Sequence, residues 1–387
     1  VIAIHSYNYR PQEAYNAVVI AKGSHAGSAD EVCIIAPQFL ETSALPASIP
    51  DNLLYWGSFP FRGTSSGRFG PNEQRVTISV FDVLDRIMET VTDPALFPNL
   101  ETIVVLGHSA GGQLVNRYAI AGRFEETLAP ERNIHLRYLV LAPSSFLYFT
   151  PARDPDGDGV FEIPSAGDLA ACPQYDDYGY GMQALYNYPA ATGLEAMLEQ
   201  YPRRFVFYMV GALDNDPEDS SLGTGCDSMA QGNQRLARST IYFNHLLDVF
   251  GPEILDRQTF SIIPGVGHSY TGQLNTDTGR RYLSDRDPAD TDGDGQSDWA
   301  EWIGGTDALD ADDTFQTAWQ APSLSAAFQM NWPAMPGRRY RILEADSPEG
   351  PFTEAEMVRP EPGEETVSWV IAPGSDPHFL KIQAELD

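Results

Sequence analysis

The sequence predicts an α/β fold: a mostly parallel sheet with an inserted cap, followed by a small all-β domain at the carboxyl end. Apolar runs rich in β-branched residues alternate with helical segments over about the first 285 of the 387 residues, a pattern typical of parallel sheets covered on both faces. One of these runs leads through a G-x-S-x-G pentapeptide into a helix. After residue 315 the chain changes to short alternating segments separated by turn signals such as Pro336-Gly337, which indicates a small β-sandwich.

The expected elements can be followed in order along the chain. Strands are expected at 1–5, 31–36, 102–106, 134–141, 204–210 and 259–263. Helices are expected at 12–21, 75–91, 112–119 and 229–250. The stretch 143–202 interrupts the alternation and is rich in Tyr, Gly, Pro and Asp, which predicts a cap above the sheet. We therefore expect an α/β domain (1–285), an acidic linker (286–314) and a β-sandwich-like module (315–387).

The composition argues against several classes of partner. The formal net charge is −30, and Lys22 and Lys381 are the only lysines. A surface this acidic disfavours nucleic acids and anionic membranes. No run of eighteen apolar residues is present, so we expect no membrane span. Because Val1–His5 already has the character of a buried strand, we expect a leader and one or two strands to precede the given sequence.

The cysteines bear on the cellular compartment. Cys33 lies in the apolar run 32–36 and is expected to be a buried thiol. Cys172 and Cys226 both lie in polar, loop-like stretches, and we predict that they form a disulfide. A disulfide implies an oxidising compartment, so the protein is expected to be secreted.

The pentapeptide Gly107-His108-Ser109-Ala110-Gly111 is the motif that points to chemistry. A predicted strand precedes it and a predicted helix follows it, which is the context of a nucleophile elbow. Small residues two before and two after the serine let the chain turn sharply enough to raise Ser109 above the sheet edge. The helix start behind it presents backbone N–H groups to an anion. The alternative is a glycine-rich turn with an idle serine.

A serine nucleophile needs a base, and the base works best when a carboxylate orients it. In sheet enzymes with an elbow, the chain order is serine, acid, histidine. Asp214 and Asp216 follow one predicted strand, and His268 follows the last strand in a glycine-rich loop. Of the seven histidines, only His268 has this order and place. Asp214 is preferred over Asp216, which precedes Pro217 and could simply shape a turn.

Two backbone groups are expected to bind the oxyanion of a reacting ester. They are the N–H of Ala110 and the N–H of Tyr7, which lies in the loop after the first strand. For Tyr7 the alternative is an ordinary polar loop. Trp56 lies in the long irregular stretch 37–72, where it could line a substrate cleft or pack beneath the loop.

Together these motifs resemble the α/β-hydrolase superfamily. The GHSAGG elbow, the GALD acid loop and the GVGH histidine loop carry the resemblance, which covers about residues 1–285. The loop Tyr7-Asn8-Tyr9-Arg10 is similar in position to the oxyanion loop of secreted esterases and polyester hydrolases, where an aromatic residue often supplies the N–H. The chain departs from that pattern at His5-Ser6, where many members have His-Gly, at Ala110, where some polyester hydrolases have Met, and in its large cap.

Two acidic loops have the spacing of calcium ligands. The first fits D-x-D-x-D-G-x5-E without a gap, and its expected ligands are Asp290, Asp292, Asp294, Gln296, Asp298 and Glu301. It resembles the aspartate-rich repeats of thrombospondin type 3, which stiffen linkers. The second keeps the D-x-D-x-D-G core but has Ser165 at position twelve, so Asp168 could complete the shell. Its expected ligands are Asp154, Asp156, Asp158, Val160 and Glu162. For both loops the alternative is a solvated acidic segment.

These observations predict a secreted serine carboxylic-ester hydrolase that works through an acyl-enzyme, with Ser109 as nucleophile, His268 as base and Asp214 orienting the base. Calcium is expected to be structural, and the chemistry is expected to need no cofactor. The expected partner is an ester, possibly polymeric, and the protein is expected to be a monomer. Alternatives within enzymes are a depolymerase of polyester and a feruloyl or acetyl esterase acting on plant polysaccharide. The alternative of another class is a catalytically dead surface- or carbohydrate-binding protein.

Overall fold

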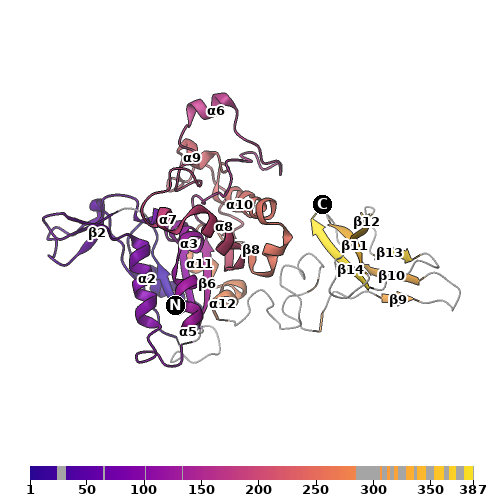
Figure 1. The fold of residues 1–387 in the computed structure, drawn as a ribbon, viewed down its shortest axis with the longest axis horizontal. Coiled ribbons are helices and arrows are strands. Elements are labelled where there is room, and N and C mark those ends of the chain that lie inside the picture. The colour runs from indigo at the N-terminus through magenta and orange to yellow at the C-terminus, as the bar shows by residue number, and fades with distance from the viewer. Residues whose placement is uncertain are drawn as a thin grey trace. The chain divides into compact units, whose positions relative to one another are not determined.

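The computed structural model divides into two compact units, Val1–Ser284 and Asp285–Asp387 (Figure 1). In the first unit it describes residues 1–23, 32–63, 66–100, 102–132 and 134–284. In the second it describes 306, 312–313, 318–320, 328–334, 338–345, 353–360, 366–371 and 379–386. The first predicted calcium loop, with Asp290, Asp292, Asp294, Gln296, Asp298 and Glu301, lies outside the described residues.

The first unit is built on a five-stranded parallel sheet, which confirms the predicted fold class. Its strands lie in the order β1-β5-β6-β7-β8. They are β1 (Ile2–Ile4), β5 (Thr102–His108), β6 (His135–Leu141), β7 (Phe205–Gly211) and β8 (Gln258–Ile263). In β5, β6 and β7 every residue except the first is buried, which is why these strands appear in the sequence as largely apolar runs.

Helices connect the strands and pack against the sheet (Figure 1). α3 (Ala110–Ala121) packs against β5 and β6, and α10 (Arg235–Phe250) packs against β7 and β8. α1 (Pro11–Gly23) packs against β1 and contacts α11 (Tyr270–Leu274) and α12 (Asp277–Ser284). Further elements are α2 (Val80–Val91), α4 (Phe124–Thr127), α5 (Ala129–Arg132) and the 3-10 turns Thr42–Ala44, Pro60–Arg62 and Pro252–Asp256. Among the described residues, none of the helices combines the length and hydrophobicity that crossing a bilayer requires.

The prediction for 31–36 was wrong in two respects. Within its described part, 32–36, the segment forms only an isolated bridge between Ile35 and Ile2, and the thiol of Cys33 is exposed. Backbone hydrogen bonds link Ile35 to Val1 and to Ala3, so the segment lies beside β1. A segment at a sheet edge has a strand partner on one side only and is less covered than a central strand, and here Cys33 is exposed while the other residues of 32–36 are half-buried.

The helix expected at 229–250 is broken into α9 (Cys226–Met229) and α10. Gly232 lies between them with a φ of 119°, a conformation that glycine adopts without steric cost. The side chain of Gln234 then begins α10 by accepting the N–H of Ala237 at 2.9 Å. The break fixes where α10 starts, and this start lies at the functional site.

The stretch 37–72 contributes to a small antiparallel sheet of β2 (Leu54–Trp56), β3 (Gly67–Phe69) and β4 (Gln74–Val76). β4 includes Arg75 and Val76, which were expected to be the first residues of a helix at 75–91. That helix, α2, begins only at Val80, because Ser79 and Asp82 form a capping box.

The segment between β6 and β7 carries α6 (Ala166–Ala171), α7 (Asn187–Thr192), α8 (Leu194–Gln200) and the 3-10 turn Tyr201–Arg203. A disulfide joins Cys172, at the end of α6, to Cys226, at the start of α9, with a Cα–Cα distance of 5.9 Å. The predicted pairing is confirmed, and α6 and α9 lie at the same end of the unit (Figure 1). The bond ties the cap to the chain that follows β7.

The second unit holds two three-stranded antiparallel sheets. One has the order β13-β10-β9 and the other β12-β11-β14. The strands are β9 (Ala318–Gln320), β10 (Phe328–Pro333), β11 (Arg338–Ala345), β12 (Thr353–Val358), β13 (Thr366–Ile371) and β14 (Phe379–Leu386). Buried side chains of both sheets, among them Trp332 from β10 and Tyr340 from β11, form one core, as in a β-sandwich.

Candidate active site

Ser109 lies in a sharp turn between β5 and α3, with φ 57° and ψ −118°. A positive φ is strained for a residue with a side chain and persists only where the surroundings enforce it. The turn requires glycine on both sides. A Cβ on Gly107 would lie 2.5 Å from the carbonyl carbon of Gly111, and a Cβ on Gly111 would lie 2.6 Å from the carbonyl oxygen of Ile4. The local geometry is that of an elbow, and it holds Ser109 at the carboxyl end of β5.

Two backbone N–H groups, those of Ala110 and Tyr7, are available to a ligand. Ala110 is the first residue of α3, so its N–H has no helical carbonyl to bond. The N–H of Ser109 itself donates to the carbonyl of Leu141 at 2.9 Å. Within the described part of the chain, the N–H of Tyr7 donates to no protein acceptor. Both sequence-predicted oxyanion donors are thus unengaged, as an oxyanion hole requires.

The structure brings Asp214 and His268 together at the carboxyl ends of β7 and β8. Nδ1 of His268 lies 2.7 Å from Oδ2 of Asp214, and Asp214 is 5% exposed. A backbone hydrogen bond from Leu213 to Val266 holds the two loops together. Asp216, the alternative acid, is exposed, and its carboxylate accepts a backbone N–H within its own turn. Only Asp214 of the two is paired with His268.

The ring of His268 lies against His108, the residue before Ser109, with 4.4 Å between the ring centroids. His108 is buried, and burial lowers its pKa well below the ordinary histidine value. It therefore stays neutral and does not compete for the proton that His268 would take. The hydroxyl of Tyr270, the first residue of α11, donates to the carbonyl of Ile4 at 3.3 Å, so α11 contacts β1.

Two further residues of this region have structural roles. Nε2 of His5 accepts the N–H of Phe39 at 2.9 Å, which anchors the chain beyond β1. Trp56 is 2% exposed, and its indole N–H donates to the carbonyl of Ile78 at 3.2 Å. Of the two alternatives for Trp56, the structure has the packed one.

One charged contact of the site was not predicted from the sequence. Nη1 of Arg235, which is 1% exposed, lies 3.2 Å from Oδ1 of Asp214. Arg235 is the first residue of α10, where the helix dipole disfavours a cation. An arginine at such a position indicates a specific anionic partner. The sequence predicts one helix over 229–250, which places Arg235 in its interior. The unusual position of Arg235 at a helix start is visible only when the break after Met229 is known.

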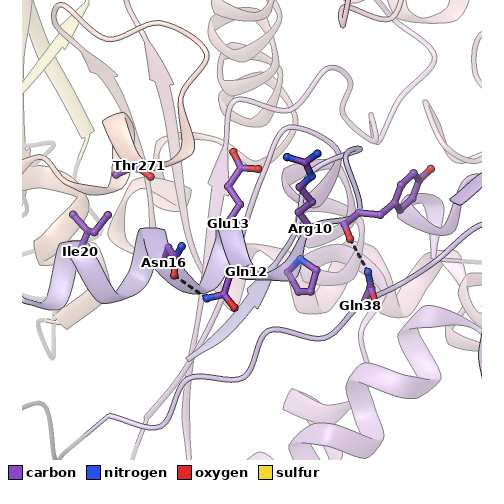
Figure 2. Close-up of a pocket in the computed structure, with 9 residues that line it drawn as sticks. Arg10, Gln12, Glu13, Asn16, Ile20, Gln38 and Thr271 are labelled. Atoms are coloured by element: carbon purple, nitrogen blue, oxygen red, sulfur yellow. Dashed lines mark hydrogen bonds between the residues drawn. The ribbon is translucent and has the colours of Figure 1, made fainter. Parts of the chain in front are cut away.

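An open cavity of about 640 Å³ adjoins the loops of the site. Tyr9 of the loop after β1 and Thr271, three residues after His268, both line it. Most of its other lining residues have polar side chains, and Figure 2 shows those of Arg10 and Glu13 extending in the same direction near the start of α1. These side chains give the cavity hydrogen-bonding groups near the loop that carries His268.

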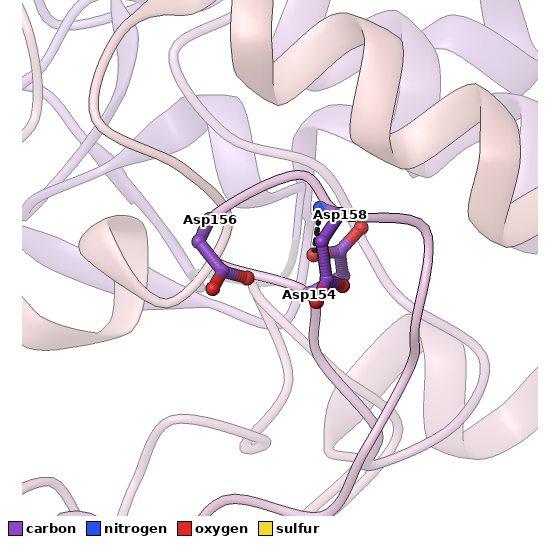
Figure 3. A group of neighbouring side chains, drawn as sticks. All are labelled: Asp154, Asp156 and Asp158. Carbon is purple, nitrogen blue, oxygen red and sulfur yellow. Dashed lines mark hydrogen bonds between the residues drawn. The ribbon is translucent and has the colours of Figure 1, made fainter.

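The second predicted calcium loop is a tight turn in the cap. Single oxygens of Asp154, Asp156 and Asp158 lie within 4.8 Å of one another (Figure 3). Asp154 is 1% exposed and accepts the N–H groups of Gly157, Asp158 and Gly159 at 2.8, 3.1 and 3.0 Å. Hard cations take several oxygen ligands around one point, and the three aspartates fit this requirement.

The other two expected ligands, Val160 and Glu162, belong to the same loop. Glu162 forms two backbone hydrogen bonds with Arg153, which close the loop. The N–H of Val160 donates to Asp158 at 2.9 Å. Within the described residues, the carboxylate cluster holds the three aspartates and does not include Glu162.

Comparison with family models finds no match, and comparison with curated proteins finds none either. Among solved structures, poly(aspartic acid) hydrolase-1 from Sphingomonas sp. KT-1 is similar, with a TM-score of 0.43 and 20% sequence identity over 70% of this chain and 83% of that chain. LpqC, a poly(3-hydroxybutyrate) depolymerase from Bordetella parapertussis, is similar with a TM-score of 0.44 and 16% identity over 70% of this chain and 75% of that chain.

Proposed function

We propose that the protein is a serine hydrolase that cleaves carboxylic esters. The observation that carries the proposal is the Asp214–His268 pair, whose imidazole lies against the residue before a serine held in a strained elbow. The pair supplies a base with an orienting carboxylate, and the elbow supplies the nucleophile. The free N–H groups of Ala110 and Tyr7 supply the electrostatic stabilisation that acyl transfer needs.

The acylation step follows from these placements. Asp214 holds the Nδ1–H of His268, so the lone pair of Nε2 is the one available to accept the hydroxyl proton of Ser109. Oγ of Ser109 then bonds to the ester carbonyl carbon, and the carbonyl oxygen becomes an oxyanion that binds the N–H groups of Ala110 and Tyr7. Collapse of this intermediate breaks the ester C–O bond, and the alcohol leaves with the proton from Nε2.

Deacylation repeats the sequence with water. Nε2 of His268 takes a proton from water, whose oxygen bonds to the acyl carbon of the Ser109 ester. The acid is released as the bond to Oγ breaks, and Oγ recovers the proton from His268. No step uses a metal, so calcium has only a structural role in this proposal.

The site is bordered by exposed apolar side chains, and this favours a particular kind of ester. Tyr7 is 59% exposed and Leu213, next to Asp214, is 61% exposed. Exposed apolar side chains beside a site can contact the apolar part of a ligand. A polyester or another ester with a large apolar part is therefore the second candidate substrate, beside small soluble esters.

The disulfide supports function in an oxidising compartment, and we propose that the protein is secreted. Calcium at millimolar concentration, as found outside cells, would then be available to the cap loop through Asp154, Asp156 and Asp158.

Calcium binding at the cap loop is expected to raise the thermal unfolding midpoint. An extracellular-type site at about 10 to 100 times its Kd in free calcium stabilises the fold by about 1–3 kcal/mol. The measurement is calorimetry of the full chain with calcium and with chelator. Asp156→Asn removes one ligand charge in the cap, and Asp292→Asn does so in the other loop, so the pair assigns the effect to a loop. Equal midpoints with calcium and chelator in the unsubstituted protein would exclude structural calcium.

A fluorophosphonate probe, with and without chelator, tests the proposed function directly. Labelling at Ser109 in both conditions is the result expected of a serine hydrolase whose calcium is structural. Labelling that is lost on chelation would mean that calcium holds the site together. An absence of labelling in both conditions would overturn the proposal and favour a binding protein with an inactive hydrolase fold.

A further inference from the structure

The buried arginine beside Asp214 has no part in the steps described above. Asp214 has two carboxylate oxygens: Oδ2 faces His268 at 2.7 Å, and Oδ1 faces Nη1 of Arg235 at 3.2 Å. A buried carboxylate that bridges an imidazole and a guanidinium is fixed at both ends. Its plane, and with it the direction of Oδ2, cannot rotate without breaking the contact to Arg235.

Arg235 is itself held by other contacts of its guanidinium. Nε donates to Oγ of Ser144 at 3.2 Å, and Nη2 donates to Oγ of Ser221 at 2.8 Å and lies 3.4 Å from Oδ1 of Asp219. The guanidinium is planar, so these partners define its orientation. Ser144 belongs to the loop after β6, and Asp219 and Ser221 belong to the loop after β7. Arg235 therefore contacts two loops of the site.

The backbone of α10 adds a second hold on the same acid. The N–H of Leu236 donates to the carbonyl of Asp214 at 3.0 Å. Side chain and main chain of the first turn of α10 therefore grip Asp214 together. The helix dipole disfavours a cation at the first turn of α10. Arg235 is stable there because the negative carboxylate of Asp214 lies beside it.

We propose that Arg235 is a positioning residue for the site: it orients the Asp214 carboxylate toward His268, and its charge sets the lower limit of the pH range in which the site is active. The catalytic part of this inference rests on the proposed hydrolase function, whereas the orientation of Asp214 does not. Asp214 shares its negative charge between two cationic partners when His268 is protonated. Removing one of them strengthens the hold of the carboxylate on the proton of His268.

The charges that face the pair come from several elements. His108 lies on β5 and is neutral because burial lowers its pKa well below the ordinary value. Hydrogen bonds from Ser221, followed by the charge of Arg235, lower the pKa of Asp219 to about 2, so Asp219 is ionised throughout the working range. Arg238, one turn along α10, is buried and cationic beside Arg235. Around the pair, His108 is thus neutral, whereas Asp219 and Arg238 carry fixed charges.

The test is a pH profile of kcat/KM for the full chain with Arg235→Met. Loss of the cation is expected to move the midpoint of the acidic limb up by about 1 pH unit. Loss of the fixed geometry is expected to lower the plateau by about 10- to 100-fold. Arg235→Lys keeps a charge but not the planar fork, so it is expected to restore the midpoint and only part of the plateau.

A matched control separates positioning from loss of stability. Arg204 is also 1% exposed and pairs with a carboxylate, Glu125, at 3.0 Å, but it precedes the other end of β7. Arg204→Met is expected to lower the unfolding midpoint while leaving the pH midpoint of kcat/KM in place. An unchanged acidic limb in Arg235→Met would overturn the proposal. If Arg235→Met does not fold, Arg235→Lys is the deciding variant. A kcat/KM plateau in Arg235→Lys equal to that of the wild type would contradict the positioning role of the guanidinium.

A substrate-free measurement keeps this inference distinct from the proposed function. The Nδ1–H of His268, held by Asp214, gives a low-field proton NMR signal whose titration can be followed without an ester. Arg235→Met is expected to shift its titration to higher pH, and Arg204→Met is not. A protein that hydrolyses no ester but shows this shift would contradict only the proposed function. An active protein whose signal titrates identically in both variants would contradict only the role of Arg235.

Discussion

Replacing Ser109 by alanine is expected to lower kcat for a short p-nitrophenyl ester by about 10⁴- to 10⁶-fold, because the substitution removes the atom that forms the acyl-enzyme. The fold should persist. The Ser109 side chain makes no capping hydrogen bond to α3, and alanine can occupy the same volume. The measurement is steady-state kinetics together with the thermal unfolding midpoint of the same preparation.

Ser261→Ala is a suitable control for this substitution. Ser261 lies on β8, and its hydroxyl bonds to that of Tyr282 at 2.9 Å, so the variant loses a serine hydrogen bond without touching the elbow. It is expected to keep turnover within about twofold. Turnover by Ser109→Ala at a comparable level, with probe labelling at another serine, would assign the nucleophile elsewhere.

Much of the sheet could be predicted because of where its strands lie. β5, β6 and β7 are covered on both faces, so most of their residues are apolar and the runs stand out in the sequence. The same parallel topology places the ends of β5, β7 and β8 along one edge, so residues that follow these strands are candidates for one site. The contact between Asp214 and His268 follows from this rule.

The features that sequence reasoning missed depend on tertiary contacts. Nothing local to 229–250 marks Gly232 as a break, because a glycine within a helical pattern is tolerated in other settings. The Trp56 side chain could have faced solvent or the core. It lies in the core, where its indole N–H donates to the carbonyl of Ile78, a contact that the sequence does not reveal. Arg235 is the clearest case, since its partner Asp214 lies 21 residues away in the sequence and no local pattern links the two.

The second large effect is expected for Asp214→Asn, which should lower kcat at neutral pH by about 10⁴-fold. The size of the loss follows from Arg235. A guanidinium only donates, so it selects the carbonyl oxygen of the new amide and turns the NH2 group toward His268. Nδ1 must then accept a hydrogen bond, which places the imidazole proton on Nε2. An imidazole protonated at Nε2 cannot take the proton of Ser109.

Asp216→Asn is the matched control, two residues along the same loop. Asp216 is exposed, and the oxygen that accepts the N–H of Glu218 is retained in asparagine, so kcat should change by no more than about twofold. The reverse order of effects, with Asp216→Asn inactive and Asp214→Asn active, would assign the acid to Asp216.

The double variant Asp214→Asn/Arg235→Met tests the reason as well as the result. Without the guanidinium, the amide is free to rotate and offer its carbonyl oxygen to the Nδ1–H of His268, which restores the tautomer that can accept a proton at Nε2. The double variant is therefore expected to be more active than Asp214→Asn alone, by about tenfold or more, although Arg235→Met by itself lowers activity. If the fold-losses in kcat of the two single variants multiply in the double variant, Arg235 does not control the orientation of the amide. The low activity of Asp214→Asn would then have to come from the missing charge.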